Sequence, residues 1–122
     1  MLEENAQTAS RSDDPLTEKE LASLTGLMDE YKKLSDLYCT GCDYCQPCPQ
    51  GVNIPFIFSQ MNNYRIYGIK ESARAEYASI GVPGGTKGEK ADKCIECGIC
   101  EEKCPQKIEI IRQLKKCGEI LG

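Results

Sequence analysis

The hydrophobic residues of this chain recur at helical spacing, three or four residues apart. In no segment long enough for a β-strand do they alternate one by one with polar residues. The first stripe predicts a helix over residues 17–37. This helix begins at a capping box, in which Thr17 and Glu20 can satisfy each other's backbone N–H groups. The stripe consists of Leu21, Leu24, Met28, Tyr31, Leu34 and Tyr38. The pattern therefore favours an all-α fold with little sheet.

Three shorter helices are predicted farther along the chain. They cover residues 56–67 after an Asn53 N-cap, residues 70–80, and residues 108–117 with Gly118 beyond the last. Residues 82–90 are rich in Gly and Lys and predict a flexible loop. A cysteine block followed by a helix occurs twice, starting at Cys39 and at Cys94. We therefore expect two similar halves that face each other across an approximate twofold axis.

Composition narrows the classes of function. The 122 residues include 9 cysteines and no histidine, and 19 acidic against 15 basic residues give a net charge of −4. The lack of histidine excludes His-dependent triads and His-ligated zinc. The acidic balance argues against nucleic-acid binding, and no apolar run is long enough to span a bilayer. Because the N-terminus has no signal-peptide profile, we expect a cytoplasmic protein whose thiols serve metal or redox chemistry rather than disulfides.

The chain is long enough for one domain. Residues 1–15 are polar and acidic, which indicates a tail or the remnant of a linker, and residues 16–122 form the predicted domain. Large apolar residues are scarce in this domain, so we expect the cysteines to help hold the fold through a bound metal centre.

The second cysteine block carries the more specific motif. It contains Cys94, Cys97, Cys100 and Cys104, followed by Pro105, which is the C-x2-C-x2-C-x3-C-P run of bacterial ferredoxins. Each iron of a cubane cluster needs one soft thiolate, and two-residue gaps let the backbone wrap around three corners. Gly98 can take the positive φ that such a curl needs. The fourth cysteine then most readily reaches a neighbouring cluster.

The first cysteine block has the same spacing between its first three cysteines, but its last gap is one residue shorter. It contains Cys39, Cys42, Cys45 and Cys48, followed by Pro49. The two blocks predict two [4Fe–4S] clusters with crossed ligands. One set is Cys39, Cys42, Cys45 and Cys104, and the other is Cys94, Cys97, Cys100 and Cys48. The alternative is two local sets of four consecutive cysteines.

Zinc is the other metal that such cysteines can bind. Structural zinc sites usually pair two C-x2-C knuckles across a longer finger, whereas consecutive two-residue gaps favour a cluster. The ninth cysteine, Cys117, lies near a helix end, and we interpret it as a small semi-buried apolar residue rather than a ligand.

Two segments carry a resemblance to a known family. Residues 39–55, C-T-G-C-D-Y-C-Q-P-C-P-Q-G-V-N-I-P, and residues 91–110, A-D-K-C-I-E-C-G-I-C-E-E-K-C-P-Q-K-I-E-I, resemble the C-terminal iron–sulfur domain of predicted aldo/keto reductases. The L-T-E-K-E-L entry at residues 16–21 is similar as well. The resemblance implies an α-helical ferredoxin fold, for which the long helical connection between Cys48 and Cys94 is suitable. It also implies that the shortened first block is normal.

The predicted function is electron transfer by a dicluster domain that serves an oxidoreductase. The resemblance implies a reductase barrel as partner, but this chain is too short to hold a barrel, and another redox protein is also compatible. No nucleophile–base pair stands out, so we do not expect catalysis by this chain alone. The alternative is a structural or interaction domain that clusters or zinc ions hold together without electron transfer. We expect shielding of the clusters from water by Val52, Ile54, Ile95, Ile99 and Ile108.

Overall fold

The computed structural model describes residues 2–10, 15–34 and 37–122, and the chain divides into two compact units, residues 1–34 and 35–122. The helices of the first unit are α1 (Leu2–Ala9) and α2 (Glu18–Leu34). Those of the second are α3 (Ile54–Arg65), α4 (Lys70–Ala78), the 3-10 turn η2 (Ala91–Lys93), α5 (Ile99–Lys103) and α6 (Ile110–Leu121). Over the described ranges there is no β-strand, so the all-α prediction is confirmed. None of these helices is both long and apolar enough to cross a membrane.

Helix α2 begins as the sequence predicts. The Thr17 backbone N–H donates to Glu20 Oε2 over 2.9 Å, and the Glu20 N–H donates to Thr17 Oγ1 over 3.3 Å, so the capping box is confirmed. The described part of the helix runs from Glu18 to Leu34, and residues 35 and 36 of the predicted helix lie outside the described residues. Leu37 is buried in the core of the second unit.

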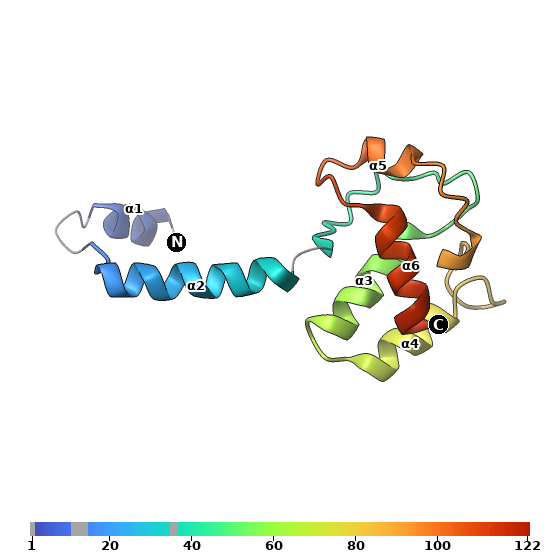
Figure 1. The fold of residues 1–122 in the computed structure, drawn as a ribbon, viewed down its shortest axis with the longest axis horizontal. Coiled ribbons are helices and arrows are strands. Elements are labelled where there is room, and N and C mark those ends of the chain that lie inside the picture. Colours follow the sequence, from blue (N-terminus) through green and yellow to red (C-terminus); the bar gives the residue numbers. More distant parts are fainter. Residues whose placement is uncertain (1, 11–14, 35–36) are drawn as a thin grey trace. The chain divides into compact units, whose positions relative to one another are not determined.

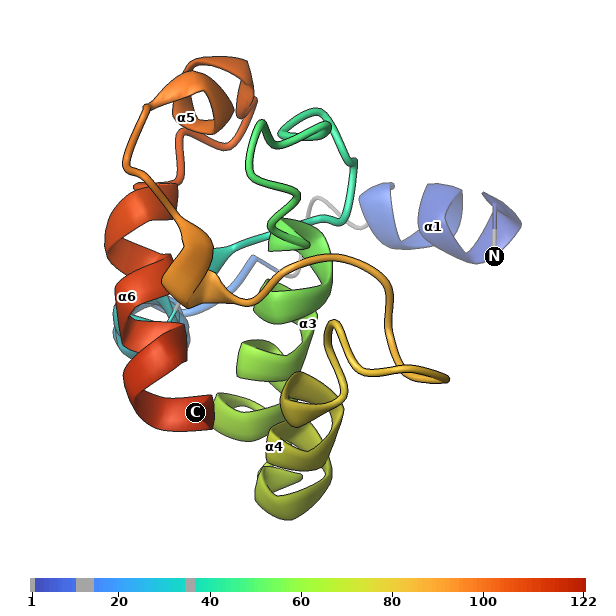
Figure 2. The ribbon, with the colours of Figure 1, turned by 90° about the vertical axis from the view of Figure 1, so that its right-hand side faces the viewer.

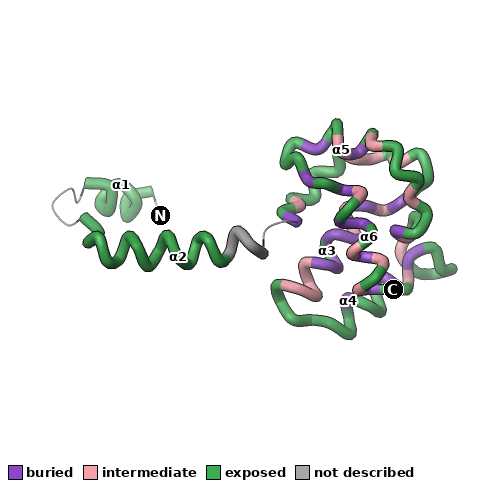
Figure 3. Tube along the Cα trace, viewed as in Figure 1, coloured by how far each residue is buried: buried purple, intermediate pink, exposed green. Residues whose placement is uncertain are grey.

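The apolar stripe of α2 faces solvent over its described part. Its members Leu21, Leu24 and Met28 are 46% to 60% exposed, and Leu27 beside them is 52% exposed. Residues 2–9, which the sequence assigns to a polar tail, form α1 with every residue exposed. The first unit thus has no buried core among its described side chains (Figure 3). The predicted domain boundary after residue 15 stays a prediction.

The second unit is built around the pair α3 and α6. These helices lie side by side, α4 packs on both, and η2 packs on α6 (Figures 1 and 2). The core between them is made by Ile54, Ile57, Phe58, Met61, Ile110, Leu114, Cys117 and Leu121. The two cysteine segments lie together at one end of the pair, and α4 lies at the other (Figure 2). The helices therefore act as a frame that presents both cysteine segments at one end.

Helix α3 starts at a cap that also ties down a distant loop. The Phe56 backbone N–H donates to Asn53 Oδ1 over 3.3 Å, which confirms the predicted N-cap, and Asn53 Nδ2 donates to the Lys87 carbonyl over 2.8 Å. Val52 pairs with Glu89 in an isolated parallel bridge. The segment 82–90, predicted as a loop, therefore lies outside any helix but is joined by hydrogen bonds to the start of α3.

The last helix differs from its predicted range. It runs from Ile110 to Leu121 instead of 108–117, so Gly118 lies inside it. Ile108 lies outside any helix but is already buried, and Leu121 extends the buried face of the helix beyond the glycine. A Cβ at Gly118 would lie 3.9 Å from Ala91 Cβ, which is an ordinary packing distance. The glycine thus lies at a packed helical position and does not end the helix.

Candidate metal centre

The first cysteine loop is shaped by two residues in the left-handed region of backbone conformation. Gly41 has φ +66° and Asp43 has φ +62°, on either side of Cys42. The loop is further braced by Gln46, whose Nε2 donates to the Val52 carbonyl over 3.0 Å and whose Oε1 accepts from the Cys48 N–H over 3.1 Å. These contacts hold the backbone in a tight curl between Cys39 and Cys48.

The second cysteine loop repeats this backbone pattern. Glu96 has φ +58° and Gly98 has φ +80°, on either side of Cys97. The positive φ predicted for Gly98 is thus confirmed. In both loops the left-handed residues lie two and four positions after the first cysteine, although glycine and an acidic residue exchange places between the loops. The repeat that the cysteine spacing predicts is therefore present in the backbone conformation.

The repeat continues beyond the cysteines into the helices. Three residues after Cys48 and after Cys104, the backbone is again left-handed, and six residues after each a long helix begins. The buried positions coincide on the two helices. The equivalent pairs are Val52 and Ile108, Ile54 and Ile110, Ile57 and Gln113, Phe58 and Leu114, and Met61 and Cys117. Cys117, which is 0% exposed, therefore occupies the position that a core methionine holds in the first half, as the apolar interpretation predicts.

Two cavities lie at the cysteine end of the helix pair. Four cysteines line the first, namely Cys39, Cys42, Cys45 and Cys104. The second is lined by Cys48, Cys94, Cys97 and Cys100, and additionally by Cys45. The other wall residues are related by the repeat: Pro105, Gln106, Ile108, Pro55 and Phe58 around the first cavity correspond to Pro49, Gln50, Val52, Ile111 and Leu114 around the second. Each cavity thus combines three cysteines of one half with the Cys-Pro of the other half.

The donor set of these cavities fits a polynuclear cluster. In the part of the chain that the structure describes, no three Cys, Asp or Glu side chains gather closely enough to hold one metal ion. Each cavity nevertheless offers at least four thiols in largely apolar walls, which are the ligands and surroundings of a [4Fe–4S] cubane. The residues present therefore fit the cluster that the sequence predicts.

Burial affects the thiols of both loops. Burial raises the pKa of Cys45 to about 11, and a thiolate at Cys39 or Cys100 would add to this rise. Burial likewise raises the pKa of Cys39 and of Cys100. A backbone hydrogen bond from Gly41 lowers the pKa of Cys39 in part. These thiols hold their protons at neutral pH until a cation replaces them, so metal uptake is coupled to proton release.

The predicted shielding residues divide into two groups. Val52, Ile54 and Ile108 are buried against the cavities, as predicted. Ile95 is 61% exposed and Ile99 is 39% exposed, although both also line the second cavity. These two residues therefore form the outer rim of that cavity and shield it less completely than expected, because the cysteine loop and the first residue of α5 lie on the surface here.

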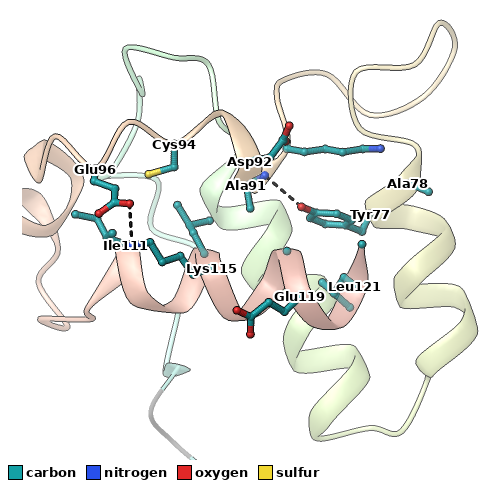
Figure 4. A pocket seen from close by; sticks show the side chains of 14 residues that line it. Tyr77, Ala78, Ala91, Asp92, Cys94, Glu96, Ile111, Lys115, Glu119 and Leu121 are labelled. Atoms are coloured by element: carbon teal, nitrogen blue, oxygen red, sulfur yellow. Dashed lines mark hydrogen bonds and ion pairs between the residues drawn. The ribbon is translucent and has the colours of Figure 1, made fainter.

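A groove of about 610 Å³, whose lining is drawn in Figure 4, adjoins the second cavity. Cys94, Ile111 and Leu114 line both. On the rim, Lys115 Nζ of α6 lies 2.7 Å from Glu96 Oε1 of the cysteine loop, and this pairing raises the pKa of Lys115. The groove thus gives molecules in solution access to the side of Cys94.

The groove is closed at its other end by α4. The Ala91 backbone N–H donates to Tyr77 Oη over 3.3 Å, and burial raises the pKa of this tyrosine (Figure 4). The contact joins α4 to η2, which directly precedes Cys94. Sequence reasoning did not identify this contact or the bracing role of Gln46, since neither residue belongs to a motif.

Comparison with known proteins gives one match. The model of the 4Fe-4S dicluster domain family matches residues 38–109, which is more than half of the chain and includes both cysteine blocks. No curated protein and no solved structure matches the chain.

Proposed function

Because the chain belongs to the 4Fe-4S dicluster domain family and so carries two [4Fe–4S] clusters, we propose that it transfers electrons between two redox partners. The observation that carries the proposal is the pair of neighbouring four-cysteine cavities at one end of an all-helical frame. When bound, each cluster accepts and returns one electron. Two such centres side by side in one small domain suit a relay better than a purely structural role.

We assign the ligands in the crossed pattern. Cys39, Cys42, Cys45 and Cys104 would hold one cluster, and Cys94, Cys97, Cys100 and Cys48 the other. The lining of the two cavities supports this assignment, because each contains the fourth cysteine of the opposite half. The remaining wall residues of the same two cavities also correspond under the internal repeat, as the crossed pattern requires.

The chain's own residues supply three things to this function. The cysteine thiolates would bind the clusters, the left-handed residues give each loop its tight curl, and the buried walls exclude water. Phe58 and Leu114 are the equivalent large side chains that cover the two cavities from α3 and α6. Excluding water and donating backbone hydrogen bonds to sulfur are the means by which a protein adjusts a cluster potential.

We further propose that the partner is a reductase barrel of the aldo/keto reductase type. The resemblance of residues 39–55 and 91–110 to the cluster domain of such enzymes supports this. So does the apolar stripe of α2, whose described side chains are about half exposed. An amphipathic helix gains most of its stability by covering its apolar face. A barrel partner would provide that cover.

Electron transfer is tested on anaerobically purified protein. Iron and sulfide analysis should indicate two clusters per chain, and dithionite should produce the EPR signal of reduced [4Fe–4S] centres. A protein that contains the clusters but gives no reduced signal at any accessible potential would favour the structural alternative. A colourless protein with bound zinc would contradict electron transfer and favour the zinc form of the structural alternative.

The barrel proposal has its own test. Leu24→Glu should weaken binding of the chain to a separately produced aldo/keto reductase barrel by at least tenfold, because it places a charge in the apolar stripe. Ser23→Glu adds the same charge at the neighbouring exposed position and serves as the matched control. Equal binding by both variants would exclude α2 as the contact surface, and a lack of binding by the unmodified chain would contradict the barrel as partner.

A further inference from the structure

The two cavities share a wall. Of the described residues that line either cavity, Cys45 and Ile54 are common to both. Ile54 is 1% exposed and lies in the first turn of α3, where it belongs to the core of the second unit. Its side chain thus lies between the two four-cysteine sets, out of contact with water.

The shared wall departs from the internal repeat. The equivalents of Cys45 and Ile54 in the second half are Cys100 and Ile110. Cys100 lines the second cavity alone, and Ile110 lines the first alone. Both shared residues therefore come from the first half of the chain, which makes the partition between the cavities asymmetric.

We propose that the Ile54 side chain, together with Cys45, forms the partition between the two clusters, and that Ile54 acts as a positioning residue that keeps the space between them apolar. The inference rests on the proposed function. A polar group or a water molecule at this position would favour the more negative, reduced state of both clusters, because a polar environment stabilises added charge. At the equivalent Ile110, a polar group would affect only the cluster held by Cys39, Cys42, Cys45 and Cys104.

The experiment compares three variants by EPR-monitored redox titration of the full chain. Ile54→Thr introduces a hydroxyl group. Valine has nearly the same volume as threonine but no hydroxyl, so comparing Ile54→Thr with Ile54→Val separates the effect of polarity from that of size. Ile110→Thr introduces the same hydroxyl at the equivalent position. We expect Ile54→Thr to move both midpoint potentials to less negative values, Ile54→Val to move them less, and Ile110→Thr to move one.

The outcomes separate the inference from the proposed function. The partition is overturned if Ile54→Thr shifts only one potential or neither, or if Ile110→Thr shifts both. Either result leaves the proposed electron transfer intact. Absence of reducible clusters in the unmodified protein would overturn the proposed function instead. If Ile54→Thr fails to assemble its clusters, Ile54→Val and Ile110→Val are compared instead. We then expect Ile54→Val to move both midpoint potentials and Ile110→Val to move one.

Discussion

At the scale of single residues, the curl of each cysteine loop depends on backbone conformation. Gly98 has φ +80°, and a Cβ there would meet no atom within 4 Å, so Gly98→Ala adds backbone strain without a clash. We expect a loss of about 1–2 kcal/mol in stability, measured by guanidinium unfolding under anaerobic conditions. Gly118→Ala is the control, because this glycine is helical and its new methyl group would make an ordinary contact; stability should stay equal or rise. Equal destabilisation by both would contradict the argument.

Cys117 illustrates a thiol that belongs to the packing. Burial raises its pKa to about 12, so the thiol stays protonated throughout the neutral range and little of the reactive thiolate is present. We expect iodoacetamide at pH 8 to leave Cys117 unmodified in the folded protein, and to modify it after unfolding, as read by mass spectrometry. Cys117→Ala should keep the full iron content. Loss of iron in this variant would instead identify Cys117 as a ligand.

At the scale of elements, the start of α2 depends on reciprocal capping. Hydrogen bonds from Thr17 hold the pKa of Glu20 below its usual value. The stability that the ionised Glu20 gives to the folded state is therefore fully present at pH 7 and is lost as the pH falls through the lowered folded-state pKa. We expect Thr17→Ala to cost the helix roughly 1 kcal/mol and to accelerate amide hydrogen exchange in its first turn by several-fold. Exchange in α6, measured in the same sample, should not change. A uniform change would mean that the cap affects the whole fold.

Helix identity was predictable where an apolar stripe and a cap agree, as in α2 and α3. The range of α6 was not, because two local signals conflict with tertiary packing. Ile108 fits the helical spacing but is buried just before the helix begins, and Gly118 resembles a helix end but lies inside α6. The short helix α5, inside the second cysteine block, has no stripe that could reveal it. Packing of α6 against η2 and α3 decided these cases.

At the scale of the whole molecule, the cysteine spacing predicted that two halves would meet, and the structure brings the Cys-Pro of each half to the opposite cavity. What spacing could not reveal is how completely the halves correspond. The equivalence of Met61 and Cys117 becomes clear only when burial is compared along both helices. The shared partition at Ile54 was likewise beyond the sequence, since it depends on which atoms line both cavities.

The crossed assignment makes a prediction about pairs of cysteines that single substitutions cannot make. If Cys48 and Cys97 serve the same cluster, Cys48→Ser with Cys97→Ser damages one cluster, and the double variant should retain half of the iron. Cys48→Ser with Cys42→Ser damages both clusters and should retain little. Local sets of four reverse this order, because Cys48 would then share its cluster with Cys42. Iron analysis of the two double variants, purified side by side without oxygen, therefore decides between the two ligand patterns. If only the variant with Cys48→Ser and Cys42→Ser retains half of the iron, the crossed pattern is refuted.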